Sequence, residues 1–209
     1  MLLLSSFGLG NLSFFIPVAS ASTDVKAMVS GGYNHVLALK SDGTVWAWGD
    51  NTNGQLGDGT SEGQQPSPRQ VYDADGDPLT DIVKVVAGGD HSMALRSDGT
   101  LWEWGGWVRS DNQMENILSP RQVSLPKVKD MATGGLFCLA LLEDGTVWGW
   151  VKNDWGQMAT GVSGLLVSFY STPVKVVGPL GIGDLTDVVK LVSSDSSPVT
   201  RILCGHREE

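Results

Sequence analysis

One stretch of this sequence occurs three times, and that repetition limits the possible folds more than any other feature. Residues 32–49 recur at 88–105 and, more loosely, at 134–150, with the shared pattern Gly-x-x-His-x-x-Ala-Leu followed by Asp-Gly-Thr-Val-Trp-x-Trp-Gly. The first tryptophans of the three copies stand 56 and 46 residues apart. Such a period is typical of propeller blades and stacked repeats.

Each copy has the composition of a β-hairpin. Residues 35–39 and 44–48 are short apolar runs, and the glycine between them tolerates the positive φ of a tight turn. Because side chains alternate along a strand, the two tryptophans of a pair share one face, and we expect the six paired tryptophans to lie in the core. We assign the repeated positions to the scaffold. They are Gly32, His35, Gly43, Trp46, Trp48, Gly88, His91, Gly99, Trp102, Trp104, Gly134, Gly145, Trp148 and Trp150.

Further short segments complete each unit. A Pro-Arg-Gln-Val segment begins at Pro68 and Pro120, and a weaker form begins at Pro173. A proline that opens a short apolar run fits the start of a strand near a sheet edge. With the segment that leads into the next unit, this predicts four short strands per unit and an all-β fold. The predicted repeats span about 25–81, 82–127 and 128–184.

The combined pattern, with the Asn-x-x-Gly-Gln-Leu-Gly segment that starts at Asn51, resembles the regulator-of-chromosome-condensation repeat. The resemblance covers roughly residues 25 to 192. It implies a β-propeller of four-stranded blades, seven in a complete ring, of which about three and a half are present here. The segment Trp-Ala-Trp-Gly-Asp-Asn is similar to the corresponding segment of bacterial secreted members, including the propeller-type inhibitors of β-lactamases.

The N-terminal segment has the composition of an export signal. Residues 1–21 carry no charge, and they end in the small-residue pattern Ala19-Ser20-Ala21. We interpret 1–21 as a secretory signal peptide, incomplete at its N-terminus because it lacks a positive region, and 22–209 as a partial propeller. The alternative is a single membrane anchor, since twenty uncharged residues can cross a bilayer. We therefore expect a secreted or cell-surface protein.

Charge argues against one class of partner. The chain has 14 Lys and Arg against 23 Asp and Glu, a net charge of −9. Non-specific binding to nucleic acid depends on Lys and Arg that displace counterions from phosphates. We therefore expect no nucleic-acid partner.

A fourth unit begins near residue 185 and then departs from the pattern. Half a ring leaves strand edges and blade faces exposed, and such edges recruit other chains. Three interpretations stay open: a fragment of a larger gene product, a frame-shifted terminus, or self-association that completes the ring. The two cysteines, Cys138 and Cys204, are either free thiols or a pair oxidised after export.

Candidate chemistry is sparse. His35 and His91 occupy equivalent positions, but Phe137 fills the third, so we interpret the position as structural. No nucleophile motif, phosphate loop or metal-ligand spacing is present in the sequence, and residues 73–84 lack the glycine and glutamate of an EF-hand. The predicted protein is not an enzyme and needs no cofactor.

The loops that follow the tryptophan pairs do not repeat, and variable loops on a rigid scaffold are where binding residues gather. Aromatic side chains there are common interface anchors. The candidate contact residues are Trp107, Trp155, Tyr170, Asn51 and Asn53, with packing against a neighbouring blade as the alternative for each aromatic side chain.

The leading hypothesis is a secreted, non-catalytic module that binds another protein or a surface component. One alternative is an inhibitor of an extracellular enzyme, similar to the β-lactamase inhibitors. The other is guanine-nucleotide exchange, as in eukaryotic members of the family. Fold alone does not choose among them.

Overall fold

The computed structural model describes residues 27–108, 113–153, 156, 159–160 and 169–192. These residues form three antiparallel sheets of four strands, each laid down in chain order. The first blade comprises β1 (Met28–Gly31), β2 (His35–Leu39), β3 (Val45–Asp50) and β4 (Gln64–Gln70). The second comprises β5 (Ile82–Ala87), β6 (His91–Arg96), β7 (Leu101–Val108) and β8 (Met114–Gln122). The third comprises β9 (Val128–Thr133), β10 (Phe137–Leu142), β11 (Val147–Lys152) and β12 (Phe169–Lys175).

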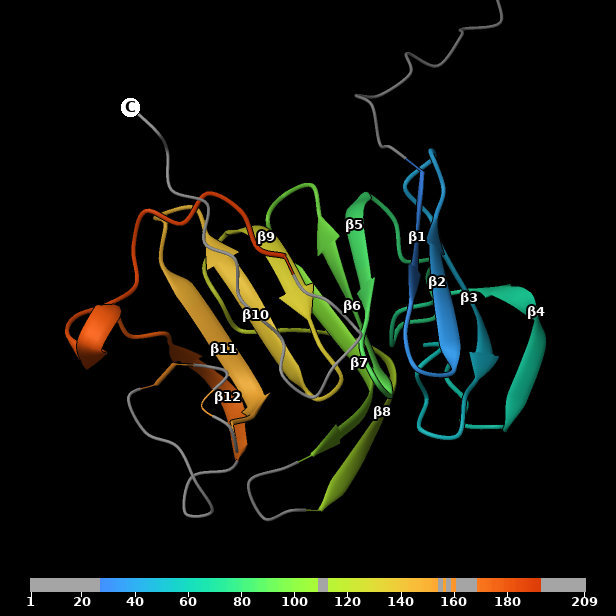
Figure 1. Ribbon diagram of the computed structural model, residues 1–209. Coiled ribbons are helices and arrows are strands. Elements are labelled where there is room, and N and C mark those ends of the chain that lie inside the picture. The colour runs from blue at the N-terminus through green and yellow to red at the C-terminus, as the bar shows by residue number, and fades with distance from the viewer. Residues whose placement is uncertain (1–26, 109–112, 154–155, 157–158, 161–168, 193–209) are drawn as a thin grey trace, which may run out of the picture.

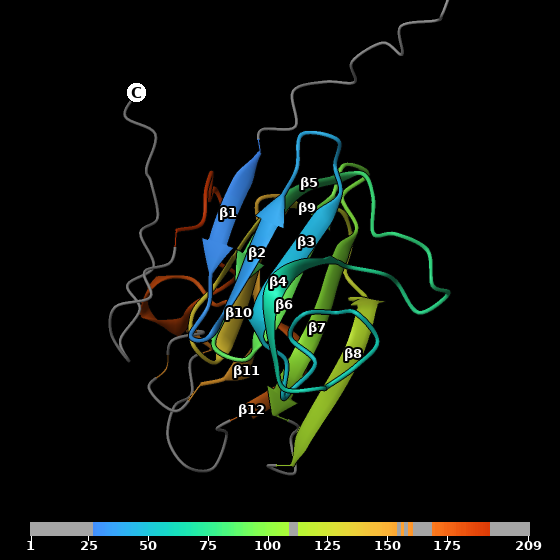
Figure 2. The ribbon, with the colours of Figure 1, turned by 90° about the vertical axis from the view of Figure 1, so that its right-hand side faces the viewer.

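The three blades stand side by side in the order of the sequence (Figure 1). Strands β1 and β2 contact β5, β5 and β6 contact β9, and β7 contacts β11, so each blade packs on the next. Figure 2 looks onto the first blade from the side that carries no further blade among the described residues. The predicted all-β fold of four-stranded blades is confirmed, and the arrangement is that of a partial β-propeller.

The Asp-Gly turn is built identically in each blade. The carboxylate of Asp42 accepts hydrogen bonds from the main-chain N–H and the hydroxyl of Thr44, at 3.0 and 2.6 Å. Gly43 has a φ of 80°, a conformation that glycine adopts without strain. The Thr44 side chain in turn accepts from the indole of Trp46 at 3.2 Å. The same bonds recur at residues 98–102 and 144–148.

Alternation along the strands decides what is buried. In β3, Val45 and Ala47 are fully buried against the second blade, whereas Trp46 and Trp48 on the opposite face are half-buried. The prediction placed all six paired tryptophans in the core. The structure buries Trp104 and Trp150 and leaves the other four half-buried.

A cation lies over the indole ring of the first tryptophan of each pair. Lys40 Nζ lies 3.7 Å from the ring centre of Trp46, and Arg96 lies 4.8 Å from that of Trp102. Lys175 lies 5.8 Å from that of Trp148. A cation over an indole face contributes about 0.5–1 kcal/mol at such exposed sites.

Residues 185–192 lie against the outer face of the third blade. Val188 and Leu191 are buried there with Phe137, Leu139 and Leu141. This segment occupies the place that β5 takes on the first blade and β9 on the second, since the Leu191 N–H donates to Asp130 in β9. Before it, the chain makes a short 3-10 turn at Pro179–Gly181.

Candidate interaction site

The two repeated histidines join neighbouring blades. His35 Nε2 lies 2.9 Å from the hydroxyl of Ser92, and His91 Nε2 lies 2.6 Å from that of Thr133. Because the Ser92 hydroxyl donates to the carbonyl of Gln55, it accepts from His35. Burial lowers the pKa of His35 to about 4 and that of His91 to about 3, so both are neutral at pH 7.

In the second and third blades, the second tryptophan of the pair contacts the preceding blade. The Trp104 indole donates to the carbonyl of Gln55 at 2.9 Å, and Trp104 is fully buried. Gln55 belongs to residues 51–60, which connect β3 and β4 and are called the glycine loop below. The glycine loop of the first blade therefore lies against the second blade.

Asn51 holds the glycine loop in shape. Its carbonyl oxygen accepts from the Leu56 N–H at 3.0 Å, and its amide donates to Asp58 and Thr60 at 3.1 Å. Asn51 is fully buried, which argues against the contact role predicted for it. Asn53, the other candidate in this loop, is half-buried beside Gly106 of the second blade.

The second blade has no Gly-Gln-Leu-Gly segment after its tryptophan pair. Its Glu103 supplies the acceptor for the tryptophan of the next blade, the role that the Gln55 carbonyl has in the first blade. Glu103 stands where the first blade has Ala47. It accepts from the Trp150 indole at 3.1 Å and from Arg121 at 3.0 Å. Burial raises the pKa of Glu103, and Arg121 opposes that shift. A side-chain carboxylate thus joins the second blade to the third.

Trp107 fills the rest of the space at this junction. It is 4% exposed, and its ring centre lies 4.6 Å from that of His91. A side chain so deeply buried offers a partner no surface, so this placement argues against the contact role predicted for Trp107. Packing against a neighbouring blade, the alternative, describes its position.

The third blade rebuilds the turns of the glycine loop. The Gly156 N–H donates to the carbonyl of Asn153 and the Ala159 N–H to that of Gly156, as Gly54 and Gly57 do in the first blade. The candidate Tyr170 is half-buried, with its hydroxyl 3.2 Å from that of Thr160. Trp155 lies outside the described residues.

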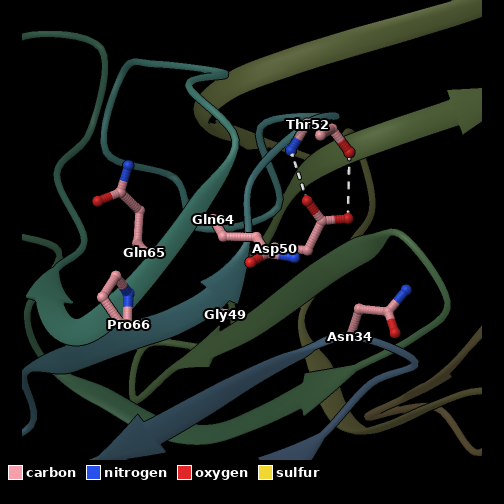
Figure 3. Close-up of a pocket in the computed structure, with 7 residues that line it drawn as sticks. All are labelled: Asn34, Gly49, Asp50, Thr52, Gln64, Gln65 and Pro66. Carbon is pink, nitrogen blue, oxygen red and sulfur yellow. Dashed lines mark hydrogen bonds between the residues drawn. The ribbon is translucent and has the colours of Figure 1, made fainter.

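The first blade carries an open pocket of about 570 Å³, lined mainly by residues with polar side chains. In Figure 3, Asp50 accepts from the N–H and the hydroxyl of Thr52, with Gln65 and Pro66 on one side and Asn34 on the other. The lining residues, called the first-blade pocket below, are Asn34, Gly49, Asp50, Thr52, Gln64, Gln65 and Pro66. Sequence reasoning missed this pocket, because its polar side chains lie at variable positions of the repeated stretch or outside it.

The described residues hold no group of three or more His, Cys, Asp or Glu placed to bind a metal ion. In the 73–77 segment, Asp73 accepts from the N–H groups of Asp75 and Asp77, as expected of a turn. No helix in the described ranges is long and apolar enough to span a bilayer. Cys138 is fully buried, and burial raises the pKa of its thiol. Cys204 and the predicted signal peptide at 1–21 lie outside the described residues.

Comparison with known proteins identifies the repeats. The sequence model described as "Regulator of chromosome condensation (RCC1) repeat" matches residues 42–95, and a second model of that repeat matches 25–55 and 82–112. The probable E3 ubiquitin-protein ligase HERC6 of Homo sapiens is 40% identical over 110 residues, which are 52% of this chain and 10% of the relative. The ultraviolet-B receptor UVR8 of Arabidopsis thaliana is 28% identical over 220 residues, 86% of this chain and 49% of the relative.

Solved structures show the same fold. Prp20p from Saccharomyces cerevisiae superposes with a TM-score of 0.62 at 23% identity, over 80% of this chain and 40% of that one. Human WBSCR16 gives 0.59 at 23% identity, over 74% and 40%. The chain thus spans about half the length of these proteins, or less. Its three blades have the propeller fold of these structures, and residues 25–112 carry the regulator of chromosome condensation (RCC1) repeat.

Proposed function

We propose that this chain is a non-catalytic protein-interaction module, exported to the cell surface or medium. The observation that carries the proposal is the contrast between scaffold and loops. The Asp-Gly turn is the same in all three blades, whereas the connections between the third and fourth strands run over residues 51–63, 109–113 and 153–168. Variable connections on a constant scaffold are the usual place for partner contacts.

Relatives support a protein partner. Yeast RCC1 (Prp20) has been crystallised bound to Kap60, and the binding properties of Prp20p to Gsp1p and histones have been studied. At 21–23% identity these structures share the fold alone with this chain, so the identity of its partner does not follow from theirs.

Two contacts in the described residues resemble catalytic pairs and are unsuited to catalysis. Ser92 and His35 are both buried, Ser92 already donates to Gln55, and His35 Nδ1 has no hydrogen-bond partner among the described residues. A triad needs an acid at that nitrogen. Cys138 Sγ lies 3.3 Å from His91 Nε2, but burial raises the pKa of the thiol and lowers that of the imidazole.

Export rests on the small-residue pattern that ends at Ala21. Expression in a bacterial host, followed by fractionation and mass spectrometry of the N-terminus, tests it. Recovery outside the cytoplasm, with the new N-terminus at Ser22, supports export. An intact, cytoplasmic N-terminus contradicts it.

Site-specific photocrosslinking tests the interaction function. Met114, 52% exposed, lies at the end of the second blade where the variable connections gather, and Ser97 is exposed in the turn at the opposite end. A benzophenone amino acid at Met114 should give discrete protein adducts in culture fluid or envelopes, and the same group at Ser97 should give none. Equal labelling at both positions, or no protein adduct at either, contradicts the proposal.

An enzyme inhibitor would be a special case of this function. Purified protein assayed against a β-lactamase panel tests it directly, with loss of hydrolysis as the supporting result.

A further inference from the structure

The connection that follows β12 carries the two most exposed large apolar side chains of the described residues. Leu180 is 96% exposed and Ile182 is 75% exposed. They belong to residues 178–184, called the apolar tip below, which Figure 1 shows around the short helical turn at the left-hand edge of the third blade. A side chain built on Gly181 or Gly183 would meet no atom within 4 Å, so the tip projects into open space. One exposed aliphatic side chain is ordinary, but a pair on one projecting turn is a candidate contact.

The apolar tip has a fixed shape. Val177 and Asp184 pair across its base as a β-bridge, and the Lys175 ammonium lies 2.6 Å from the Asp184 carboxylate. Inside the turn, the Gly178 N–H donates to the carbonyl of Gly183 at 2.9 Å. The two apolar side chains therefore stand on a closed turn, and a segment that is already ordered loses less entropy when it binds.

Leu180 has a main-chain conformation that folding alone disfavours. Its φ of 60° and ψ of 16° lie in the left-handed region, which glycine and asparagine adopt more readily than leucine. At 96% exposure, the side chain gains almost nothing from packing. Residues held in such conformations gather at functional sites. Contact with a partner explains a leucine at this position better than the stability of the chain does.

The first blade contains the same connection without the apolar side chains. Between its bridged residues, Tyr72 and Pro78, the sequence is Asp-Ala-Asp-Gly-Asp, whereas residues 178–183 read Gly-Pro-Leu-Gly-Ile-Gly. Ala74 in the first of these turns is exposed although the four strands of the second blade follow it. The exposure of such a turn therefore does not depend on the blade that follows. The shorter connection of the second blade packs its Leu125 against the core.

A lipid surface is one class of occupant for exposed aliphatic side chains, and the observations disfavour it. Even a whole myristoyl chain gives only marginal membrane binding, and two side chains bury less apolar area. The net charge of −9 adds no attraction to anionic lipids. A fluid lipid surface also gains nothing from the fixed geometry of the turn, whereas a pocket in a protein requires it.

Two pockets of the described residues would receive the apolar tip of a second copy poorly. The cleft of about 250 Å³ between the second and third blades is lined by charged side chains that include Arg96, Lys127 and Glu143. The first-blade pocket is lined mainly by polar side chains. An aliphatic side chain placed in either would remove water from these groups without replacing its hydrogen bonds. A different protein is the better partner.

We propose that the apolar tip is a docking element that inserts Leu180 and Ile182 into an apolar, uncharged pocket of another protein. Residues 178–183 carry no charge, so the pocket needs no charge to match them. The proposal rests on the proposed function of a protein-interaction module and adds a second contact to it. Because Lys175 in β12 pairs with Trp148 at the start of β11, this contact lies at the end of the third blade opposite its variable connection.

Site-specific photocrosslinking in the full chain tests the proposal. An aliphatic diazirine amino acid replaces Ile182, which keeps Leu180 in place, and the matched control carries it at Ala74 in the exposed turn of the first blade. Both proteins are irradiated with cell envelopes and with culture fluid. We expect a discrete protein adduct at position 182, at least about tenfold stronger than at position 74, that excess unlabelled parent chain abolishes.

A Leu180→Asn variant separates binding from folding. Asparagine tolerates the left-handed conformation, so the variant should unfold at the temperature of the parent chain or above it. As a competitor for the adduct at position 182 it should be at least about tenfold weaker than the parent chain. Equal competition, a lowered unfolding temperature, or no adduct at position 182 in a folded protein overturns the proposal.

Further measurements distinguish the other occupants. Sedimentation with phosphatidylcholine vesicles and analytical ultracentrifugation compare the parent chain with Leu180→Asn. Vesicle binding or self-association that the variant loses would assign the apolar tip to a lipid surface or to a second copy, and would overturn the proposal. An adduct at Ile182 without one at Met114 would support the apolar tip and contradict the use of the variable connections. The reverse result would contradict the apolar tip alone.

Discussion

The indole N–H of Trp104 donates to the carbonyl of Gln55 at 2.9 Å, and this bond crosses the boundary between the first and second blades. The same carbonyl accepts from the Ser92 hydroxyl at 2.8 Å, which itself contacts His35. One main-chain oxygen of a loop thus joins three side chains from two blades. In a repeat protein each unit is stabilised mainly by its neighbours, so this junction should influence stability strongly.

Replacement of Trp104 and of Trp48 by phenylalanine should have unequal effects. Trp104→Phe removes a buried hydrogen bond and opens a cavity, and should lower the free energy of unfolding by about 2–3 kcal/mol. Trp48 has the same local sequence but is half-buried, so Trp48→Phe should lower it by less than about 1 kcal/mol. Urea denaturation followed by circular dichroism measures both. Equal losses would show that the junction does not increase the contribution of Trp104 to the free energy of unfolding.

The buried histidines should make the fold sensitive to mild acid. Burial lowers the pKa of His35 from 6.5 to about 4, so the unfolded chain takes up a proton there before the folded chain does. Stability should therefore fall as the pH drops below 6.5, by about 2 kcal/mol for this group at pH 5. His35→Phe copies Phe137 of the third blade and should remove that share of the loss. Denaturation at pH 7 and pH 5 compares the two proteins, and an unchanged loss in the variant contradicts the assignment.

Glu103 should act in the opposite sense. Burial raises the pKa of Glu103 above the ordinary 4.5. Between pH 4.5 and the raised value, the folded state therefore holds a proton that the unfolded state has released. The contribution of this group to stability is complete below pH 4.5 and declines as the pH rises through the folded value. Glu103→Gln keeps an acceptor for Trp150 and should gain stability relative to the parent protein across that window. The free energy of unfolding of both proteins is measured as a function of pH. Curves that run parallel would contradict a raised pKa for Glu103.

What the sequence predicts well is what depends on neighbouring residues along the chain. The Asp42–Thr44 turn needs only a short polar side chain followed by glycine, and the alternation of Val45 and Trp46 needs only the strand period of two. Both repeat three times, and such repetition is evidence that one local structure is specified. The four-stranded blade could therefore be predicted from the order of the residues alone.

What depends on neighbouring blades could not be predicted in this way. Trp48 and Trp104 lie in nearly identical sequences, yet among the described residues only Trp104 has a blade on its outer side. Asn51 and Trp107 lie where the sequence predicts surface loops, but both are buried between neighbouring blades. Glu103 did leave a signal, because it interrupts a tryptophan pair where the other copies have Ala47 and Gly149. That contrast between copies points to the junction of the second and third blades, which has no glycine loop among the described residues.

Val151 provides a test of strain at that junction. Its φ of 80° is rare for a β-branched residue, and its counterparts Gly49 and Gly105 have φ values of 109° and 99°. A non-glycine residue held in this region costs about 1–3 kcal/mol. Val151→Gly loses a buried side chain but releases that strain.

The matched control is Val147→Gly, because Val147 lies in the same strand, is buried and has no positive φ. We expect Val151→Gly to cost about 1–3 kcal/mol less than Val147→Gly in the free energy of unfolding. Thermal and urea denaturation of the two variants measure this difference. Equal costs would mean that the third blade holds Val151 without strain.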